Sequence, residues 1–148
     1  MIYIAHRGNI TGKNINTENT VGQINYCLSI NLDVEIDIWY YHKNLWLGHD
    51  EPKYKINENF LYNKKLWCHA KNSEALFYMS NNKNIHYFWH NLDNYTITSK
   101  GYLWALSGCD LNHQTICVLP ENYDYSTNGL GVCAGICSDN IMRYKYVK

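Results

Sequence analysis

Apolar and polar residues alternate in several short runs, and this pattern predicts a chain rich in β-strands. The clearest run spans residues 34–41, where branched apolar residues alternate with acidic ones. Since successive side chains of a strand point to opposite faces, Glu35 and Asp37 are expected to share one face. Further strands are expected at residues 2–5, 45–48, 66–70, 85–89, 96–98, 102–106, 115–119 and 135–137.

Helical periodicity is convincing only in the first half of the chain. Residues 17–20 can cap a helix, because Thr and Asn side chains accept hydrogen bonds from free backbone N–H groups, and apolar residues then follow at helical spacing as far as Leu28. A second helix is expected to be capped by Asn72 or Ser73 and to run through Met79.

The order of these elements predicts an α/β fold. Strand, helix and strand follow one another at the start of the chain, which is typical of a parallel barrel. The 148 residues form a single domain, residues 1–148, but a regular barrel needs about 200 residues or more. We therefore expect a compact, helix-depleted TIM-like (β/α) barrel, with an α+β sandwich as the alternative.

Composition narrows the classes of partner. The hydrophobic fraction is 46%, the charged fraction 18% and the formal net charge +0, so the broad basic surface that nucleic acids require is not expected. No apolar run approaches the roughly 20 residues of a membrane span. The apolar start of the chain is too short for a signal peptide, which predicts a cytoplasmic protein whose six Cys are reduced thiols.

The candidate chemistry lies at the ends of the first predicted strands. His6 and His49 each follow a strand, and parallel strands bring such positions to one edge beside Glu35 and Asp37. Two carboxylates on one face repel each other unless a cation lies between them, and magnesium and calcium prefer oxygen ligands. Histidines suit acid–base work near neutral pH, and Arg7 offers a charged donor set for a phosphate. Together these groups indicate cleavage of a phosphate ester.

Four motifs occur in order: His6-Arg7-Gly8, Glu18-Asn19-Thr20, Glu35-Ile36-Asp37 and His49-Asp50. This ordered set resembles the glycerophosphodiester phosphodiesterase family, within the superfamily of phospholipase-C-like phosphodiesterases. The resemblance implies a distorted eight-stranded α/β barrel in which His6 and His49 are the catalytic pair. It also implies that Glu35 and Asp37 bind magnesium or calcium, and that Arg7 and Glu18 line the phosphate site.

Two later segments extend the resemblance. His69-Ala70-Lys71 falls where the family has an acidic metal ligand, a spacer and a lysine. Lys71 would then contact the phosphate and His69 the metal, and an imidazole suits softer divalent ions, so manganese joins the candidates. Residues 135–139 resemble the strand that closes the family's barrel.

The predicted function is a metal-dependent phosphodiesterase that cleaves a glycerophosphodiester or a related lipid-derived phosphodiester, lysophospholipid-like substrates included. The alternatives are a cyclising lyase of the phospholipase or sphingomyelinase-D type, and a catalytically impaired binding protein on the same scaffold. Three residues also have plain structural interpretations. Glu18 is favourable in any first helical turn, Lys71 suits a surface, and His69 suits a buried, hydrogen-bonded position. The oligomeric state stays open.

Overall fold

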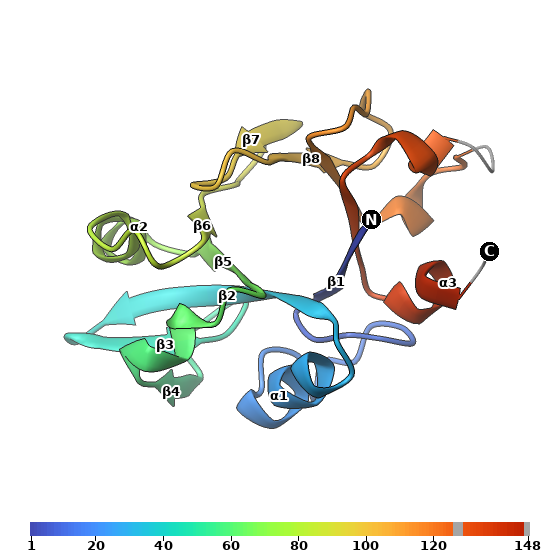
Figure 1. Ribbon diagram of the computed structural model, residues 1–148. Helices are drawn as coiled ribbons and strands as arrows, with labels where there is room; N and C mark the ends of the chain where they lie inside the picture. Colours follow the sequence, from blue (N-terminus) through green and yellow to red (C-terminus); the bar gives the residue numbers. More distant parts are fainter. Residues whose placement is uncertain (126–128, 147–148) are drawn as a thin grey trace.

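The computed structural model describes residues 1–125 and 129–146, and the strands in these ranges form one curled sheet (Figure 1). The strands are β1 (Ile2–His6), β2 (Asp33–Tyr41), β3 (Asn44–Leu47), β4 (Tyr54–Ile56), β5 (Leu66–Ala70), β6 (Tyr87–Phe88), β7 (Tyr95–Ile97), β8 (Leu103–Leu106), β9 (Thr115–Val118) and β10 (Gly135–Ser138). The α-helices are α1 (Val21–Ser29), α2 (Ser73–Ser80) and α3 (Ile141–Tyr146), and the 3₁₀ turns are η1 (Glu58–Tyr62), η2 (Pro120–Asn122) and η3 (Gly129–Val132).

Most neighbouring strands run parallel. The parallel path is β6–β5–β2–β1–β10–β9–β8, so the first and last strands of the chain lie side by side. Three strands are antiparallel to their neighbours: β3 and β4 extend β2 as a meander, and β7 pairs with β8. The sheet curls into a half-barrel, with α1, α2 and α3 on its outer side (Figure 1).

The prediction of a TIM-like (β/α) barrel was wrong. The sheet is mixed, and the described residues show no strand pairing that would close it between β6 and β7 or β8. Helices do not alternate with strands: the connection from β8 to β9, residues 107–114, contains no helix. The connections 89–94, 98–102 and 107–114 are too short for a helix that could cover the sheet, and the described part of 119–134 forms only the 3₁₀ turns η2 and η3. A curled sheet with sparse outer helices therefore forms.

Most of the individual elements were predicted correctly. The Thr20 side chain caps α1 by accepting a hydrogen bond from the N–H of Gln23, and Asn72 caps α2 in the same way through Ala75. The strand β4 and the helix α3 were not predicted, and the run at 85–89 forms only the two-residue β6. Among the described residues, no helix combines the length and the hydrophobicity needed to cross a membrane.

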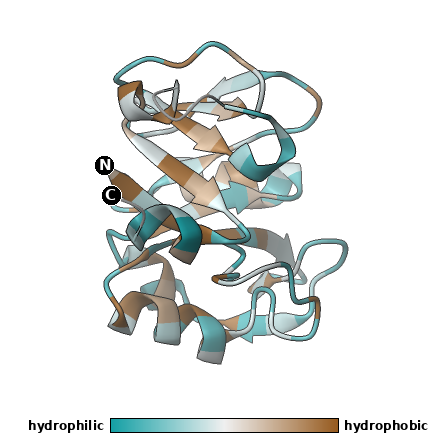
Figure 2. Cartoon of the chain, turned by 90° about the vertical axis from the view of Figure 1, so that its right-hand side faces the viewer, coloured by the Kyte–Doolittle hydropathy of each residue, from teal (hydrophilic) through white to brown (hydrophobic). Residues whose placement is uncertain are grey.

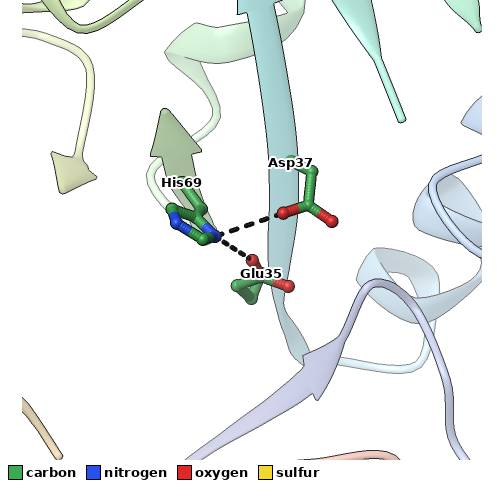
Figure 3. A group of neighbouring side chains, drawn as sticks. All are labelled: Glu35, Asp37 and His69. Carbon is green, nitrogen blue, oxygen red and sulfur yellow. Dashed lines mark ion pairs between the residues drawn. The ribbon is translucent and has the colours of Figure 1, made fainter. Parts of the chain in front are cut away.

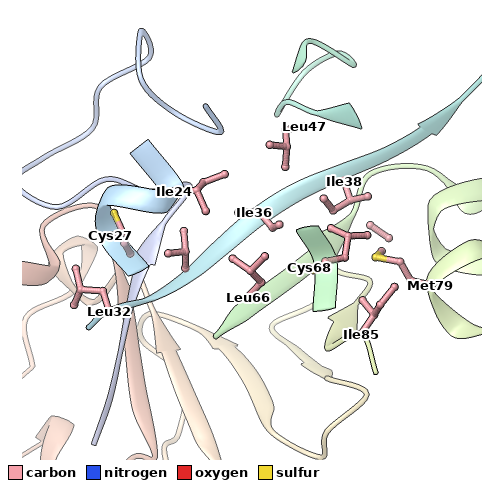
Figure 4. Close-up of a cluster of buried hydrophobic side chains, with 14 of the residues drawn as sticks. Ile24, Cys27, Leu32, Ile36, Ile38, Leu47, Leu66, Cys68, Met79 and Ile85 are labelled. Carbon is pink, nitrogen blue, oxygen red and sulfur yellow. The ribbon is translucent and has the colours of Figure 1, made fainter. Parts of the chain in front are cut away.

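Two apolar layers cover the two faces of the sheet. The outer layer packs α1 and α2 against the apolar side chains of β2 and β5, such as Ile36 and Cys68 (Figure 4). The inner layer lies on the opposite face and contains Ile4, Trp67, Phe88, Trp104, Ile116, Val118 and Cys137. Much of the hydrophobic colour therefore lies on the strands, and much of the hydrophilic colour on loops and helices (Figure 2). All six Cys are free thiols, as predicted.

Candidate active site

The inner face of the sheet becomes polar at the carboxyl ends of β1, β2 and β5. Strand register explains this arrangement, because His6 lies beside Glu35, and Asp37 lies beside His69, on neighbouring parallel strands. The alternate residues of β2 point into the outer apolar layer, which confirms that Glu35 and Asp37 share one face. The structure thus brings together polar residues that lie far apart in the sequence.

Glu35, Asp37 and His69 form the centre of this cluster (Figure 3). Both carboxylates are buried, and each residue offers one ligand atom within 4.8 Å of the other two. The Nδ1 atom of His69 lies 3.2 Å from Oδ1 of Asp37 and 3.6 Å from Oε1 of Glu35. Two ligands at right angles around one cation with bonds of about 2.2 Å lie about 3 Å apart, so these separations fit a shared divalent ion.

Two contacts hold the ring of His69 in place. Its Nε2 atom lies 2.8 Å from the carbonyl oxygen of His90, and since a carbonyl can only accept, Nε2 carries a proton. The ring also stacks on Phe88, with centroids 5.0 Å apart and planes inclined by 7°. Burial alone would lower the pKa of His69, but Asp37 and Glu35 raise it to about 9. Without a cation, the ring therefore carries the positive charge that faces the two carboxylates.

Asp37 is the most enclosed acidic group of the site. Asn19 donates from Nδ2 to Oδ2 of Asp37 at 2.9 Å and accepts from the backbone N–H of Asp37 at 3.0 Å. Burial would raise the pKa of Asp37, but the positive charges of His69, Lys71 and Arg7 lower it well below its usual value. Lys71 Nζ lies 3.5 Å from Oδ1 of Asp37, yet this oxygen accepts no hydrogen bond from any described residue. An orphaned buried oxygen directed at the cluster is a further feature that fits a cation.

Arg7 stands on a strained loop that follows β1. Its φ of 52° and the φ of 57° at Asn19 lie in the left-handed region, and the Asn19 N–H donates to the Arg7 carbonyl at 3.0 Å. The guanidinium Nε lies 3.2 Å from Oδ2 of Asp37, and Nη1 lies 3.6 Å from Oε2 of Glu18. The backbone N–H of Arg7 donates to Glu35. Backbone strain of this kind persists where surrounding contacts hold it, and it often accompanies a functional site.

His6 is oriented by a residue near the other end of the chain. Its Nδ1 lies 2.7 Å from Oδ1 of Asp139, and its Nε2 lies 3.9 Å from Oε2 of Glu35. Asn9 donates from Nδ2 to both Asp139 and Glu18 at 2.8 Å, which ties the two acidic groups together. Burial would lower the pKa of His6, but the hydrogen bond to Asp139 and the charge of Glu35 raise it.

The sequence did not predict roles for Asp139, Asn9 or Asn19. The available signal for Asp139 was its place in the segment 135–139, which resembles a family's closing strand. Pairing of β10 with β1 brings that segment beside His6. The signal for Asn19 was its place in the motif Glu18-Asn19-Thr20, whereas Asn9 offered no clear signal, since Asn is abundant throughout this chain.

His49 does not join the cluster. Its ring lies 2.6 Å from Oδ1 of its own neighbour Asp50, and 36% of its side chain is exposed. Within the described ranges, no hydrogen bond or ion pair links His49 to His6, Glu35 or Asp37. It lines a hollow of about 130 Å³ that Glu18 also lines, so it lies at the margin of the site rather than within it.

The remaining predicted site residues do converge. Glu35, Asp37 and His69 could hold a divalent cation, while Arg7, Lys71 and Glu18 surround them. Comparisons with models of protein families, with curated proteins and with solved structures found no match. The case for a function therefore depends on the geometry of this cluster and on the order of its motifs.

Proposed function

We propose that the chain is a metal-dependent phosphodiesterase that cleaves a glycerophosphodiester or a related lipid-derived phosphodiester. One observation carries the proposal: His6, the positively charged side chains of Arg7 and Lys71, and a candidate cation site lie together at one edge of the sheet. The order of the motifs in the sequence supports the same reaction class. Magnesium and calcium are the cations first expected from the sequence, with manganese as a third.

The binding roles follow from the donors that remain free. Glu35, Asp37 and His69 would hold the divalent cation, which when bound supplies positive charge to a phosphate oxygen. Arg7 and Lys71 each use only part of their donors on Asp37 and Glu18. Their remaining N–H groups can bind the non-bridging oxygens as negative charge grows there.

His6 is the residue best placed to move a proton. Asp139 holds its Nδ1, so Nε2 is the atom available to a substrate. The hydrogen bond to Asp139 and the charge of Glu35 raise the pKa of His6, which favours the protonated ring and suits donation of a proton to the leaving alcohol. His49 would then act as the base that activates water or a neighbouring hydroxyl of the substrate.

Hydrolysis of bis(p-nitrophenyl) phosphate and of glycerophosphocholine tests the proposal. Purified protein would be assayed with magnesium, calcium, manganese or cobalt, and with EDTA. We expect turnover that EDTA removes, and a loss of about 100-fold or more in His6→Gln and Glu35→Gln. Phosphorus NMR of the products distinguishes hydrolysis from release of a cyclic phosphate.

Exposed residues provide the matched controls. His113→Gln and Glu74→Gln make the same chemical changes at exposed positions of the described chain, and both should keep full activity. If the folded protein shows no turnover with any of the cations and substrates, or if His6→Gln stays fully active, the proposal is wrong.

The position of His49 favours a second candidate, a binding protein with impaired catalysis. This residue is partly exposed, and its ring is bonded to Asp50 rather than to any residue of the cluster within the described ranges. A protein of this kind would bind a phosphodiester in the presence of the cation without cleaving it. Titration calorimetry with glycerophosphocholine separates the two candidates, because binding without product formation supports the second.

A further inference from the structure

The imidazole of His69 presents a nitrogen donor to the cation site. Its Nε2–H is used by the carbonyl of His90, and its ring is stacked on Phe88. Nδ1 is therefore the only ring atom that faces Glu35 and Asp37, at 3.6 and 3.2 Å. A hydrogen bond from the outer ring nitrogen to a carbonyl is the usual support of a metal-bound histidine, because it fixes the ring and makes the inner nitrogen a better donor.

The charges around the site weaken its attraction for a hard cation. Two cationic side chains stand beside the ligand carboxylates, since Arg7 and Lys71 lie 3.2 and 3.5 Å from Asp37, although Arg7 also pairs with Glu18 at 3.6 Å. Magnesium and calcium bind oxygen ligands mainly through net negative charge. The positive charges of Arg7 and Lys71 offset part of this negative charge, so affinity depends more on the strength of the individual metal–ligand bonds. Such bonds favour later first-row transition metals, to which an imidazole nitrogen binds well.

A buried oxygen that accepts no hydrogen bond adds a second observation. Oδ1 of Asp37 is fully enclosed and accepts no hydrogen bond within the described part of the chain. It is also the carboxylate oxygen nearest to Nδ1 of His69. An enclosed oxygen and an oriented nitrogen thus point toward the same place, as two ligands of one ion do.

We infer that His69 makes this site select a borderline transition-metal ion of the Zn²⁺ or Co²⁺ kind over Mg²⁺ and Ca²⁺. The inference rests on the metal site of the proposed function, but it concerns binding and needs no turnover. It assigns to His69 the choice of cation, which an acidic residue in its place would reverse.

Equilibrium dialysis of the whole chain against Co²⁺, Mg²⁺ and Ca²⁺ tests the inference. The wild-type protein should bind one Co²⁺, and the ratio of its Co²⁺ affinity to its Mg²⁺ affinity should fall at least about tenfold in His69→Glu. His113→Gln removes an exposed histidine and Cys109→Ser a half-exposed thiol, and neither change should alter the ratio.

Proton NMR of the wild-type Co²⁺ complex gives a second readout that needs no variant. A proton on Nε2 that is protected by the His90 carbonyl should give a strongly shifted, exchangeable signal. An unchanged affinity ratio in His69→Glu, the absence of the shifted signal, or no binding of any of the three cations overturns the inference. Co²⁺ binding through His69 in a protein without turnover would leave the inference standing and reject the phosphodiesterase. Turnover with magnesium, together with an unchanged affinity ratio in His69→Glu, would support the phosphodiesterase and overturn the inference.

Discussion

The two ends of the inner face of the sheet use the same strands for different purposes. Toward the amino ends, Ile4 on β1 and Trp67 on β5 belong to an apolar layer. Two residues further along the same strands, His6 and His69 belong to the polar cluster. Since side chains two apart point to the same face, each strand supplies one residue to the core and one to the site.

This difference separates the sources of stability from the sources of chemistry. The apolar end is stabilised by burial of apolar surface and by close packing, neither of which requires a particular polar partner. The side chains at the polar end are largely buried, so their charges act strongly on one another and each needs a partner. Changes at the two ends should therefore differ in their effect on the free energy of unfolding, on its pH dependence and on activity.

The largest effect on the free energy of unfolding is expected from Trp67→Ala, which disrupts the apolar layer. The side chain is 2% exposed, and its indole N–H donates to Asp33 at 2.9 Å. A cavity and an unpaired acceptor should lower the free energy of unfolding by about 3–5 kcal/mol, measured by urea denaturation. Trp89→Ala is the control, because Trp89 is 40% exposed and should cost far less. Equal losses at the two positions would contradict the layer described above.

Asp37→Asn disrupts the polar cluster and should have the next largest effect on the free energy of unfolding. The change keeps the shape but removes the charge that pairs with Arg7, His69 and Lys71. We expect a loss of about 1.5–3 kcal/mol in the free energy of unfolding, together with loss of cation binding. Asp110→Asn makes the same change at an exposed position and should be neutral in both measurements. A variant that binds the cation normally would remove Asp37 from the proposed ligands.

Alkaline pH should weaken the polar end of the metal-free protein. His69 has a pKa raised to about 9, against 6.5 in the unfolded chain. Its ion pairs with Glu35 and Asp37 contribute fully below pH 6.5 and are lost as pH rises through 9. The slope is at most about 1.4 kcal/mol per pH unit, measured by urea denaturation in EDTA. His69→Gln should lose this slope, and an unchanged slope would show that another group causes it.

Acid pH should instead weaken the apolar end, through His86. This buried ring packs on Trp67 and bonds to Thr98, and burial, with the charge of Lys100, lowers its pKa to about 4. As pH falls from 6.5 to 4, the unfolded chain binds a proton that the folded chain does not, so stability falls over this window. His86→Gln should flatten the curve there, whereas His113→Gln should leave it as it is.

Asp139→Asn should have the smallest effect on the free energy of unfolding. Its main effect is expected on turnover, which separates the polar end from the apolar end. The amide can still bond to His6, but it no longer favours the charged ring. We expect a change below about 1 kcal/mol in unfolding and a fall of about 10–100-fold in turnover. Because His6 is the proposed proton donor, the alkaline limb of the pH–rate profile should also move to lower pH, which a purely structural role would not produce. Asp139→Glu should restore part of the rate.

Local features of the chain were predicted well because their causes are local. Alternation with a period of two placed Glu35 and Asp37 on one face, and the side chains of Thr20 and Asn72 marked the starts of both predicted helices. The closure of the sheet was predicted wrongly, since it depends on how many residues remain for outer helices and on which edges find partners. The role of Asp139 could not be read locally, because 133 positions separate it from His6.

The amino-acid sequence by itself determined most of the strands, the shared face of Glu35 and Asp37, and most of the residues at the candidate site. Only the tertiary structure decided that the sheet stays an open half-barrel, that His49 stands at the margin of the site, and that Asp139 orients His6. The physical reason is the separation along the chain of the residues that set each property. Side-chain direction follows from neighbouring residues, whereas the pairing, burial and pKa of a polar group depend on segments that only the folded chain brings together.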